Sequence, residues 1–419
     1  MRARGAWIYA TLRPRAGRRL PEELRAGTVG RLAESLASGV SDAGFERLIA
    51  RIDSGPIHCG NQVRLFFSGE EAFASILEAV AGAAEEVLLE TYILRDDATG
   101  RKLVGVLAEA VGRGVRVQVL ADNYGSWAAK RSFWRRMRSL GIEGRLFHPF
   151  WSHLRGLLFR DHRKIIVIDR RVCFTGGMNV ANEYGSSHRN EDVAWRDTHA
   201  RIEGPTAGEL ALVFGEGWGR AGGVSQPRPA VPARERSGAS TLVLDSRAGR
   251  GHRETAAVLA ALVGASRKRL WITNSYFAPN RTAIRLLGCA AQRGVDVRLL
   301  LPGPTDMPLV RHAGHGNYSA LLAHGVRVFE YQAAVLHAKT LVVDDFVSVV
   351  GSSNLDFRSF YFNAECNVLI LDEGTGRRMA RAFEEDLDQA IEVRPEVWHR
   401  RPLAHRLGDA LARCLSPLL

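Results

Sequence analysis

Apolar residues in this chain form short runs that occur twice in the same order. Segment 86–94 (EVLLETYIL) is an apolar run with a polar residue and a tyrosine near its end, and so is segment 269–277 (RLWITNSYF). Each is followed by the end of a helical pattern, an Arg-Gly break and an alternating strand pattern, at 108–122 and at 288–302. Alternating strands and helices favour βαβ units, and their repetition indicates an internal duplication. One further strand is expected in each half, at 142–147 and 326–331.

These patterns divide the chain into five parts. Segment 221–240 is rich in Pro, Gly and Ser and lacks apolar periodicity, which is typical of a linker. On either side, residues 56–220 and 241–395 are expected to form two similar α/β domains related by a pseudo-twofold axis. Each domain is predicted to be a mixed, largely parallel sheet flanked by helices. Residues 1–55 and 396–419 are interpreted as a basic, amphipathic N-terminal extension and a basic, amphipathic C-terminal segment.

One short motif stands at the same place in both halves. The stretch HRKIIVID, from His162 to Asp169, recurs as HAKTLVVD, from His337 to Asp344, so that both contain His-x-Lys-x4-Asp. Seven residues after each aspartate comes a turn of small residues ending in asparagine, GGMN at 176–179 and GSSN at 351–354. Two matches with the same trailing turn exclude coincidence and support the duplication.

Composition limits the kind of partner and the kind of site that the chain can have. The formal net charge of +12 favours an anionic partner, which on charge alone is a nucleic acid, an acidic lipid surface or a phosphorylated small molecule. Only five of the 57 basic residues are lysine, yet both motifs contain lysine, so these positions require a compact ammonium group. Five scattered cysteines without CxxC spacing indicate neither a disulfide framework nor a zinc site, and they favour a reducing compartment.

The motif residues fall into groups by their place on the strand. The histidine and lysine are two apart at a strand start and point from the same face, whereas the aspartate at the far end is expected to fix the hairpin. The candidate catalytic set is His162, Lys164, Asp169, His337, Lys339 and Asp344. Amides and polar side chains of the turns are candidates for holding phosphate oxygens: Asn179, Asn354, Ser353, Gly176 and Gly351. Tyr92, Asn123, Asn274 and Tyr276 either line a headgroup pocket or only solvate strand ends.

One acidic residue precedes the last strand of each half, Asp197 and Glu365. Either could hold the Nδ1–H group of an imidazole and set its tautomer, or serve only in a structural salt bridge. Apposed halves would bring two histidines to one phosphodiester, one attacking phosphorus to form a phosphohistidine and the other protonating the leaving alkoxide. The two lysines would supply the positive charge, so neither a metal nor a cofactor is expected.

The paired motif with its trailing turns resembles the phospholipase D superfamily over roughly residues 63–372. Segments 195–205, 306–311 and 350–368 are similar to bacterial cardiolipin synthases of the shorter type without N-terminal membrane spans. The resemblance implies two phospholipase D-like domains and transfer of a phosphatidyl group between two phosphatidylglycerol molecules, with release of glycerol. It also implies that His162 is the nucleophile and His337 the acid and base, a choice that the symmetry of the motifs leaves open.

Three other functions remain possible at this point. A nuclease or phosphodiesterase of the same superfamily would suit the positive charge, but the chain contains no recognisable nucleic-acid-binding module. A hydrolytic phospholipase D would differ only in using water to resolve the phosphohistidine. A non-catalytic lipid-binding scaffold is disfavoured because both motifs are intact.

The chain contains no apolar run near the roughly 20 residues that span a bilayer and no secretory signal pattern, so it is interpreted as soluble or bound at a membrane surface. Together with the resemblance, this gives an expected location at the inner membrane, bound peripherally on the cytoplasmic side. Three segments could contact lipid. Residues 1–20 mix aromatic residues with arginines, as a transit peptide or nucleic-acid arm also would. Residues 149–158 (PFWSHLRGLL) form an apolar insertion that could instead cover a sheet edge. In segment 398–419 one helical face, which could also pack on the domain, contains Leu403, Leu407, Leu411, Cys414 and Leu415.

Overall fold

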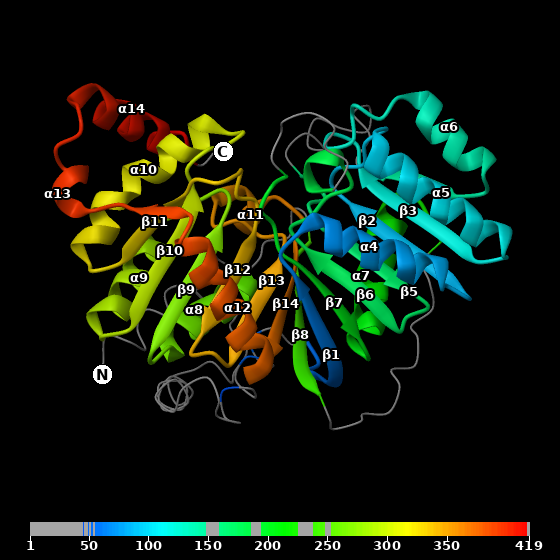
Figure 1. The fold of residues 1–419 in the computed structure, drawn as a ribbon, viewed down its shortest axis with the longest axis horizontal. Helices are drawn as coiled ribbons and strands as arrows, with labels where there is room; N and C mark the ends of the chain where they lie inside the picture. The colour runs from blue at the N-terminus through cyan, green and yellow to red at the C-terminus, as the bar shows by residue number, and fades with distance from the viewer. Residues whose placement is uncertain are drawn as a thin grey trace, which may run out of the picture.

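The computed structural model describes residues 45, 49, 52, 55–147, 159–185, 194–224, 238–247 and 253–416 (Figure 1). Two of the sequence-based expectations on lipid contact, those for residues 1–20 and 149–158, lie outside the described residues. Most of the expected linker, residues 225–237, also lies outside them.

The first half of the molecule alternates strands with helices up to a hairpin and then ends in a long helix. Its strands are β1 (His58–Phe66), β2 (Glu86–Thr91), β3 (Arg116–Asp122), β4 (Glu143–Phe147), β5 (Ile165–Ile168), β6 (Val172–Gly176) and β7 (His199–Glu203). Its helices are α4 (Gly69–Ala81), α5 (Ala98–Gly112), α6 (Arg131–Ser139), the short 3-10 helix η3 (Asn182–Tyr184) and α7 (Thr206–Arg220).

The second half repeats this order and then adds a C-terminal extension. Its strands are β8 (Ala239–Asp245), β9 (Arg269–Asn274), β10 (Asp296–Pro302), β11 (Arg327–Tyr331), β12 (Lys339–Val343), β13 (Val347–Gly351), β14 (Cys366–Leu371) and β15 (Ala390–Glu392). Its helices are α8 (Arg253–Ala265), α9 (Arg281–Gln292), α10 (Pro308–Ala323), α11 (Phe357–Tyr361), α12 (Glu373–Leu387), α13 (Pro395–Trp398) and α14 (Leu403–Cys414).

The strands of the described residues form one 15-stranded sheet. Corresponding strands of the two halves follow one another in the same order on both sides of its centre. From β1 the order is β7-β6-β5-β2-β3-β4, and from β8 it is β14-β13-β12-β9-β10-β11, with β15 beyond. The two central strands pair antiparallel, as a twofold axis between them requires. The predicted α/β fold of two similar halves is therefore confirmed.

The sheet is mixed, but it is not largely parallel as predicted. In each half only the first three crossover strands pair in parallel, β2–β3–β4 and β9–β10–β11. The motif strands β5 and β12 run antiparallel to β2 and β9, and every later pairing is antiparallel too. The antiparallel pairing of β5 with β6 follows from the turn after the motif, where Asp169 and Arg170 both have left-handed backbones with φ of 49° and 52°. Two such residues form the tight turn that folds a strand back on its neighbour.

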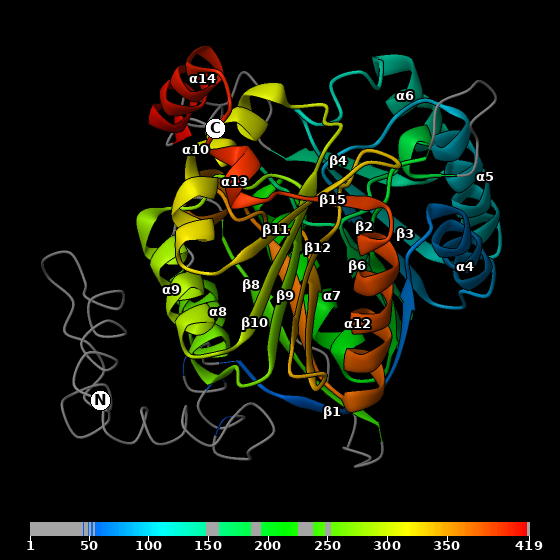
Figure 2. The ribbon, with the colours of Figure 1, turned by 60° about the vertical axis from the view of Figure 1, so that its left-hand side comes forward.

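Helices cover the outer faces of the two halves, and a shared core joins them. Helices α4, α5 and α6 pack on the first half, and α8, α9 and α10 pack on the second (Figures 1 and 2). Helices α7 and α12 belong to a core built from strands of both halves, in which the Trp271 and Phe383 rings stack with their centroids 5.1 Å apart. The halves are thus held against each other by apolar packing.

The motif aspartates lie at the far end of the motif strands from the histidines, and they hold backbone rather than substrate groups. Asp169 accepts hydrogen bonds from the amides of Ala84, Glu85 and Glu86 at 2.8, 2.7 and 2.8 Å. Asp344 does the same for the amides of residues 267, 268 and 269. Both were included in the candidate catalytic set, and this placement gives them a structural role, fixing the start of β2 and of β9.

We therefore expect Asp169→Asn to destabilise the fold while sparing the chemistry. The amide keeps the shape and the tolerance for a left-handed backbone but cannot accept all three hydrogen bonds, so the free energy of unfolding should fall by about 1–2 kcal/mol. Urea unfolding measures this loss, and kcat of the folded fraction should stay within about twofold of the unmodified protein. A fall of kcat by orders of magnitude at unchanged stability would instead make the aspartate catalytic.

Candidate active site

The two motif histidines are fixed by backbone from the opposite half of the molecule. Because β5 runs antiparallel to β2, its first residues lie beside the end of β2, and the same holds for β12 and β9. The amide of His162 donates to the carbonyl of Ala364 at 2.8 Å, and the amide of His337 donates to the carbonyl of Arg196 at 2.7 Å. Each histidine therefore stands at the seam between the halves.

The imidazole of His162 is held by a carboxylate from the second half. Its Nδ1 lies 3.0 Å from Oε2 of Glu365, and both side chains are buried. Glu365 also accepts hydrogen bonds from the side chains of Ser352, Ser359 and Asn363. Burial opposes the charge, but His162, Lys164 and these donors outweigh it and hold the pKa of Glu365 below its ordinary value. An ionised Glu365 places the proton of His162 on Nδ1 and leaves Nε2 with a free electron pair.

The imidazole of His337 is held in the reciprocal way by the first half. Its Nδ1 lies 2.7 Å from Oδ2 of Asp197, whose other oxygen accepts the amide of Thr198 at 2.7 Å. Burial raises the pKa of Asp197 to about 6, so this carboxylate is less firmly ionised than Glu365. The Nε2 atom of His337 lies 3.5 Å from the hydroxyl of Tyr184. Each half thus supplies one histidine and the acid that orients the other.

The two motif lysines are buried beside the histidines that precede them. Lys164 Nζ donates to the carbonyl of His162 at 2.7 Å, and Lys339 Nζ donates to the carbonyl of His337. Burial lowers the pKa of Lys164 to about 7 and that of Lys339 to about 8. Burial also lowers the pKa of His162 to about 4, and burial with the charges of Lys339 and Lys164 holds the pKa of His337 well below its ordinary value. An anion bound here would oppose all four of these shifts.

The pH dependence of kcat/KM should follow these groups. As pH rises through about 7 to 8 the lysines lose the protons that attract a phosphodiester, so kcat/KM is expected to fall. On the acid side, neutral His162 should persist well below pH 6, since its pKa is about 4. A pH profile at constant ionic strength checks both limbs. A kcat/KM profile that stays flat to about pH 9.5 would contradict the assignment.

The turns after the motifs lie against polar residues in or just before the last strand of the motif sheet in each half, Asp197 and Asn367. A Cβ on Gly177 would stand 2.1 Å from Oδ1 of Asp197, and one on Gly351 would stand 2.2 Å from Oδ1 of Asn367. Small residues here let the neighbouring polar side chains approach closely. Gly176 has φ of 153° and borders Thr198 and His199, and Ser353 bonds with Asn367 through its amide and its hydroxyl.

The motif asparagines are engaged with neighbouring groups in this structure. Asn179 accepts the amide of Ile93 at 3.1 Å and donates to the hydroxyl of Tyr184 at 2.9 Å. Asn354 accepts the hydroxyl of Ser275 at 2.8 Å. Asn179 therefore connects, through Tyr184, to the Nε2 side of His337, whereas Asn354 is joined to Ser275 at the end of β9.

Aromatic rings surround both imidazoles, and two of them were not anticipated from the sequence. Tyr92 lies edge-on to His162 with ring centroids 5.0 Å apart, and Tyr276 lies 6.0 Å from His337. These were candidate headgroup residues, while Asn274 accepts the amide of Leu355 and Asn123 is buried. The unanticipated rings are Tyr184 and Trp195, at 5.2 and 5.4 Å from His337. Trp195 stands two residues before Asp197 and begins segment 195–205, and these are the sequence signals that could have drawn attention to it.

The reciprocal arrangement can perform nucleophilic and acid–base chemistry on one phosphorus atom. Each imidazole has its Nδ1 bound to an acid of the opposite half, and Nε2 of His337 lies near Lys339 Nζ and the Tyr184 hydroxyl. Backbone bridges join Asp161 to Ala364 and Arg196 to Leu336 across the seam beside the two histidines, so both rings belong to one site. Two lysines in the same site can stabilise the oxygens of a phosphate. Fold and site together define a two-domain enzyme of the phospholipase D class.

Comparison with known proteins identifies the family within this class. The family model described as "Cardiolipin synthase, PLD-like domain" matches residues 76–214 and again residues 259–387, and the chain belongs to this family. The cardiolipin synthase of Geobacillus sp. (strain WCH70) is 32% identical over 92% of this chain and 78% of that protein. Cardiolipin synthase A of Pseudomonas aeruginosa (strain LESB58) is 34% identical over 89% of this chain and 76% of that protein.

A solved structure supports the fold. Phosphatidylserine synthase of Haemophilus influenzae Rd KW20 matches 89% of this chain and 99% of its own with a TM-score of 0.69, at 15% sequence identity. The resemblance seen in the sequence is thus confirmed, and the chain is a phospholipase D-type phosphatidyltransferase with a phospholipid substrate.

Proposed function

We propose that this enzyme forms cardiolipin by transferring a phosphatidyl group from one phosphatidylglycerol molecule to another and releasing glycerol. The observation that carries the proposal is the pair of buried imidazoles, each oriented by an acid of the opposite half, in a chain of the cardiolipin synthase family. Such a pair provides one nucleophile and one proton carrier in a site shared by both halves.

In the first step Nε2 of His162 attacks the phosphorus of phosphatidylglycerol. The bond from phosphorus to the glycerol oxygen breaks, and protonated His337 gives its proton to that oxygen, so that glycerol leaves neutral. The phosphatidyl group remains on His162 as a phosphohistidine. His337 starts this step protonated because the bound phosphodiester anion raises its pKa from the low value of the empty site.

The second step is the reverse of the first, with the hydroxyl of a second phosphatidylglycerol in place of glycerol. Neutral His337 takes the proton from a glycerol hydroxyl of a second phosphatidylglycerol, whose oxygen attacks phosphorus. The bond from phosphorus to Nε2 of His162 breaks, and cardiolipin leaves. Lys164 and Lys339 neutralise the nonbridging oxygens in both steps, with Asn179 as a further donor once Tyr184 shifts.

The unequal carboxylates support His162 as the nucleophile. Glu365 has four side-chain donors, counting His162, and a pKa below its ordinary value, whereas burial raises the pKa of Asp197 to about 6. A firmly ionised acid behind Nδ1 increases the basicity of Nε2 and stabilises the positive phosphohistidine. The weaker anion at Asp197 suits a histidine that must both give and take a proton.

The proposed place of action is the cytoplasmic side of the inner membrane, with the enzyme bound peripherally to a surface that contains phosphatidylglycerol. A diacyl substrate requires contact with a lipid surface, and the net charge of +12 suits an anionic one. In the described ranges, no helix is both long and apolar enough to cross a membrane.

Mass spectrometry of the lipids made from phosphatidylglycerol tests the proposal. We expect cardiolipin and free glycerol in equal amounts, and added glycerol should drive the reaction back. Phosphatidic acid as the main product would make the enzyme a hydrolase, since water would then resolve the intermediate. Turnover of single-stranded DNA without any lipid product would overturn the lipid assignment.

A further inference from the structure

The C-terminal helix α14 is packed in an inverted way, with its polar side inward and its leucines outward. Four leucines spaced four residues apart form one stripe along it, and their side chains are exposed: Leu403 by 71%, Leu407 by 65%, Leu411 by 69% and Leu415 by 43%. We call these four residues the leucine stripe. A surface helix of a globular protein ordinarily buries such a stripe, so this helix exposes apolar area for contact with something else.

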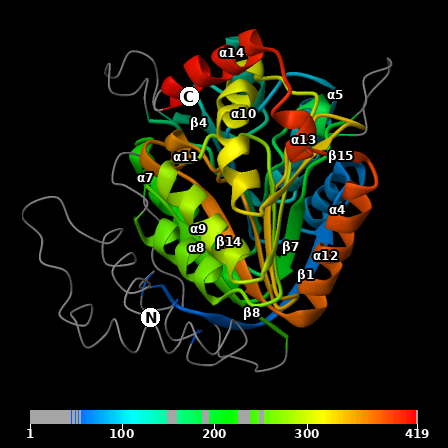
Figure 3. The same ribbon diagram turned by 90° about the vertical axis from the view of Figure 1, so that its left-hand side faces the viewer.

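Specific polar contacts hold the opposite side of α14 on α10. Asp409 is buried, with its Oδ1 2.8 Å from Nδ1 of His312 and its Oδ2 2.8 Å from the guanidinium of Arg401. The guanidinium of Arg413 donates to the carbonyl of Gly316 at 3.0 Å, and Ala412 packs in a small apolar cluster with Ala278 and Ala313. The orientation of the helix is thus set by its buried side, and the exposed leucines face outward as a consequence. Figure 3 shows α14 lying on α10 at the edge of the molecule.

We propose that the leucine stripe docks the enzyme on an anionic lipid surface, an inference that rests on the proposed function. Charge complementarity selects this occupant. The segment from 399 to 416 contains four arginines against one acid. Because the buried Asp409 pairs with Arg401, the remaining positive charges are Arg400, Arg406 and Arg413. Leucines on one side of a helix with arginines around them are the composition of helices that lie in the headgroup region of anionic membranes.

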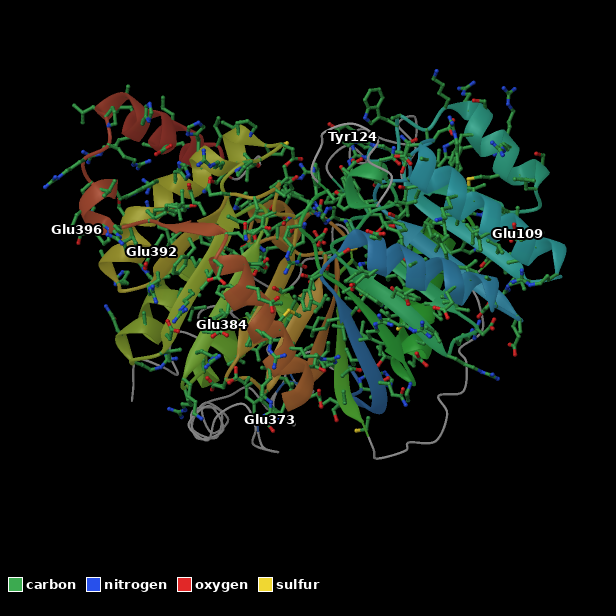
Figure 4. All side chains as sticks on the ribbon, viewed as in Figure 1. Glu109, Tyr124, Glu373, Glu384, Glu392 and Glu396 are labelled. Atoms are coloured by element: carbon green, nitrogen blue, oxygen red, sulfur yellow. The ribbon has the colours of Figure 1, made fainter. Side chains whose placement is uncertain are left out.

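Other exposed apolar residues lie at the same edge of the molecule as the stripe. Met307 and Leu309, each 44% exposed, stand at the start of α10, on which α14 packs. In the first half the turn after β3 exposes Tyr124 by 51% and Trp127 by 75%. Figure 4 places Tyr124 at the upper edge, and α14 and α6 lie at that edge in Figure 1.

Contacts also connect the active site to this edge of the molecule. The hydroxyl of Tyr276, whose ring contacts His337, donates to Asp306 at 2.8 Å, immediately before Met307. The guanidinium of Arg160, two residues before His162, lies 4.7 Å from the ring centre of Tyr124. Docking through the stripe therefore turns the site toward the layer in which the phosphodiester of a membrane lipid lies.

Vesicle flotation with the full-length chain tests the proposal. The unmodified protein should bind vesicles of phosphatidylglycerol and phosphatidylcholine, and Leu407→Ser with Leu411→Ser should weaken partitioning by about tenfold or more. Both positions are exposed, so the thermal unfolding midpoint and circular dichroism should not change. The matched control is Ile391→Ser in β15, which removes a side chain that is 63% exposed on another part of the surface, and it should bind like the unmodified protein.

Undiminished binding by the double variant would overturn the proposal. So would a change from dimer to monomer in sedimentation with vesicle binding intact, because the stripe would then be a contact between two copies of the chain. Cardiolipin formation by the unmodified protein in detergent micelles is measured in parallel. If no cardiolipin forms but vesicle binding still depends on the leucine stripe, the proposed function is wrong and the docking stands. If cardiolipin forms but vesicle binding does not depend on the stripe, the docking alone is wrong.

Discussion

His162→Ala is expected to abolish turnover of every substrate, whereas His337→Ala should lose activity according to the leaving group. Without the nucleophile no phosphohistidine forms, so kcat should fall by roughly 10⁴-fold or more with any phosphodiester. Without His337 the departing glycerol has no proton donor, and the loss with phosphatidylglycerol should be about 10²- to 10⁴-fold. From a phosphatidyl ester of nitrophenol, the leaving group departs as the stable nitrophenolate anion and needs no proton donor. His337→Ala should therefore release nitrophenolate in a burst while the phosphatidyl group passes to His162, and then stall.

Stopped-flow absorbance of nitrophenol measures that burst, and vesicle binding by both variants serves as the control for folding. A burst from His162→Ala instead of His337→Ala would reverse the two roles. Equal loss by both variants with both leaving groups would contradict the division into nucleophile and proton carrier.

Glu365→Gln should have the second largest effect, and it should act on the histidine of the other half. The amide cannot hold the Nδ1 proton of His162 as an ionised carboxylate does, so both the tautomer and the charge stabilisation are lost. We expect kcat to fall by about 10²- to 10⁴-fold with little change in vesicle binding. The loss should not add to that of His162→Ala in a double-mutant cycle, because both changes disable one unit.

Glu330→Gln is the matched control for this variant. Glu330 also accepts a hydrogen bond from a buried histidine, His315, at 2.8 Å, but it lies in β11 and outside the motif. Its replacement should cost stability and leave kcat nearly unchanged. If Glu365→Gln and Glu330→Gln reduced kcat equally, the special role of Glu365 would be refuted.

Two features of the molecule could be predicted from the sequence: the order of strands and helices, and the positions of the motif histidines and lysines. Strand and helix order follow from apolar periodicity within each half, and the doubled His-x-Lys-x4-Asp motif located the histidines and lysines. The antiparallel share of the sheet was missed because a buried run such as IIVI is apolar in either kind of pairing. The hairpin at Asp169 was expected and is present, but no local signal indicated that β5 would pair antiparallel with β2.

The exchange of acids between the halves could not be read from the sequence. Asp197 and Glu365 each precede the last strand of their own half, and only the packing of the halves brings each to the histidine of the other. Asymmetric neighbours such as Tyr184 and Trp195 have no counterpart that a comparison of the two repeats would reveal. The outward face of α14 likewise depends on Asp409 finding His312 and Arg401, which periodicity alone does not specify.

The central claim is that a phosphatidyl group passes through His162 in a site completed by the second half. Rapid-quench mass spectrometry of His337→Ala after reaction with the nitrophenyl substrate tests it most directly. The account predicts one phosphatidyl group per chain, attached to the peptide that contains His162 and labile in acid as a phosphoramidate is. No covalent adduct at all, or an adduct on any residue other than His162, would contradict it.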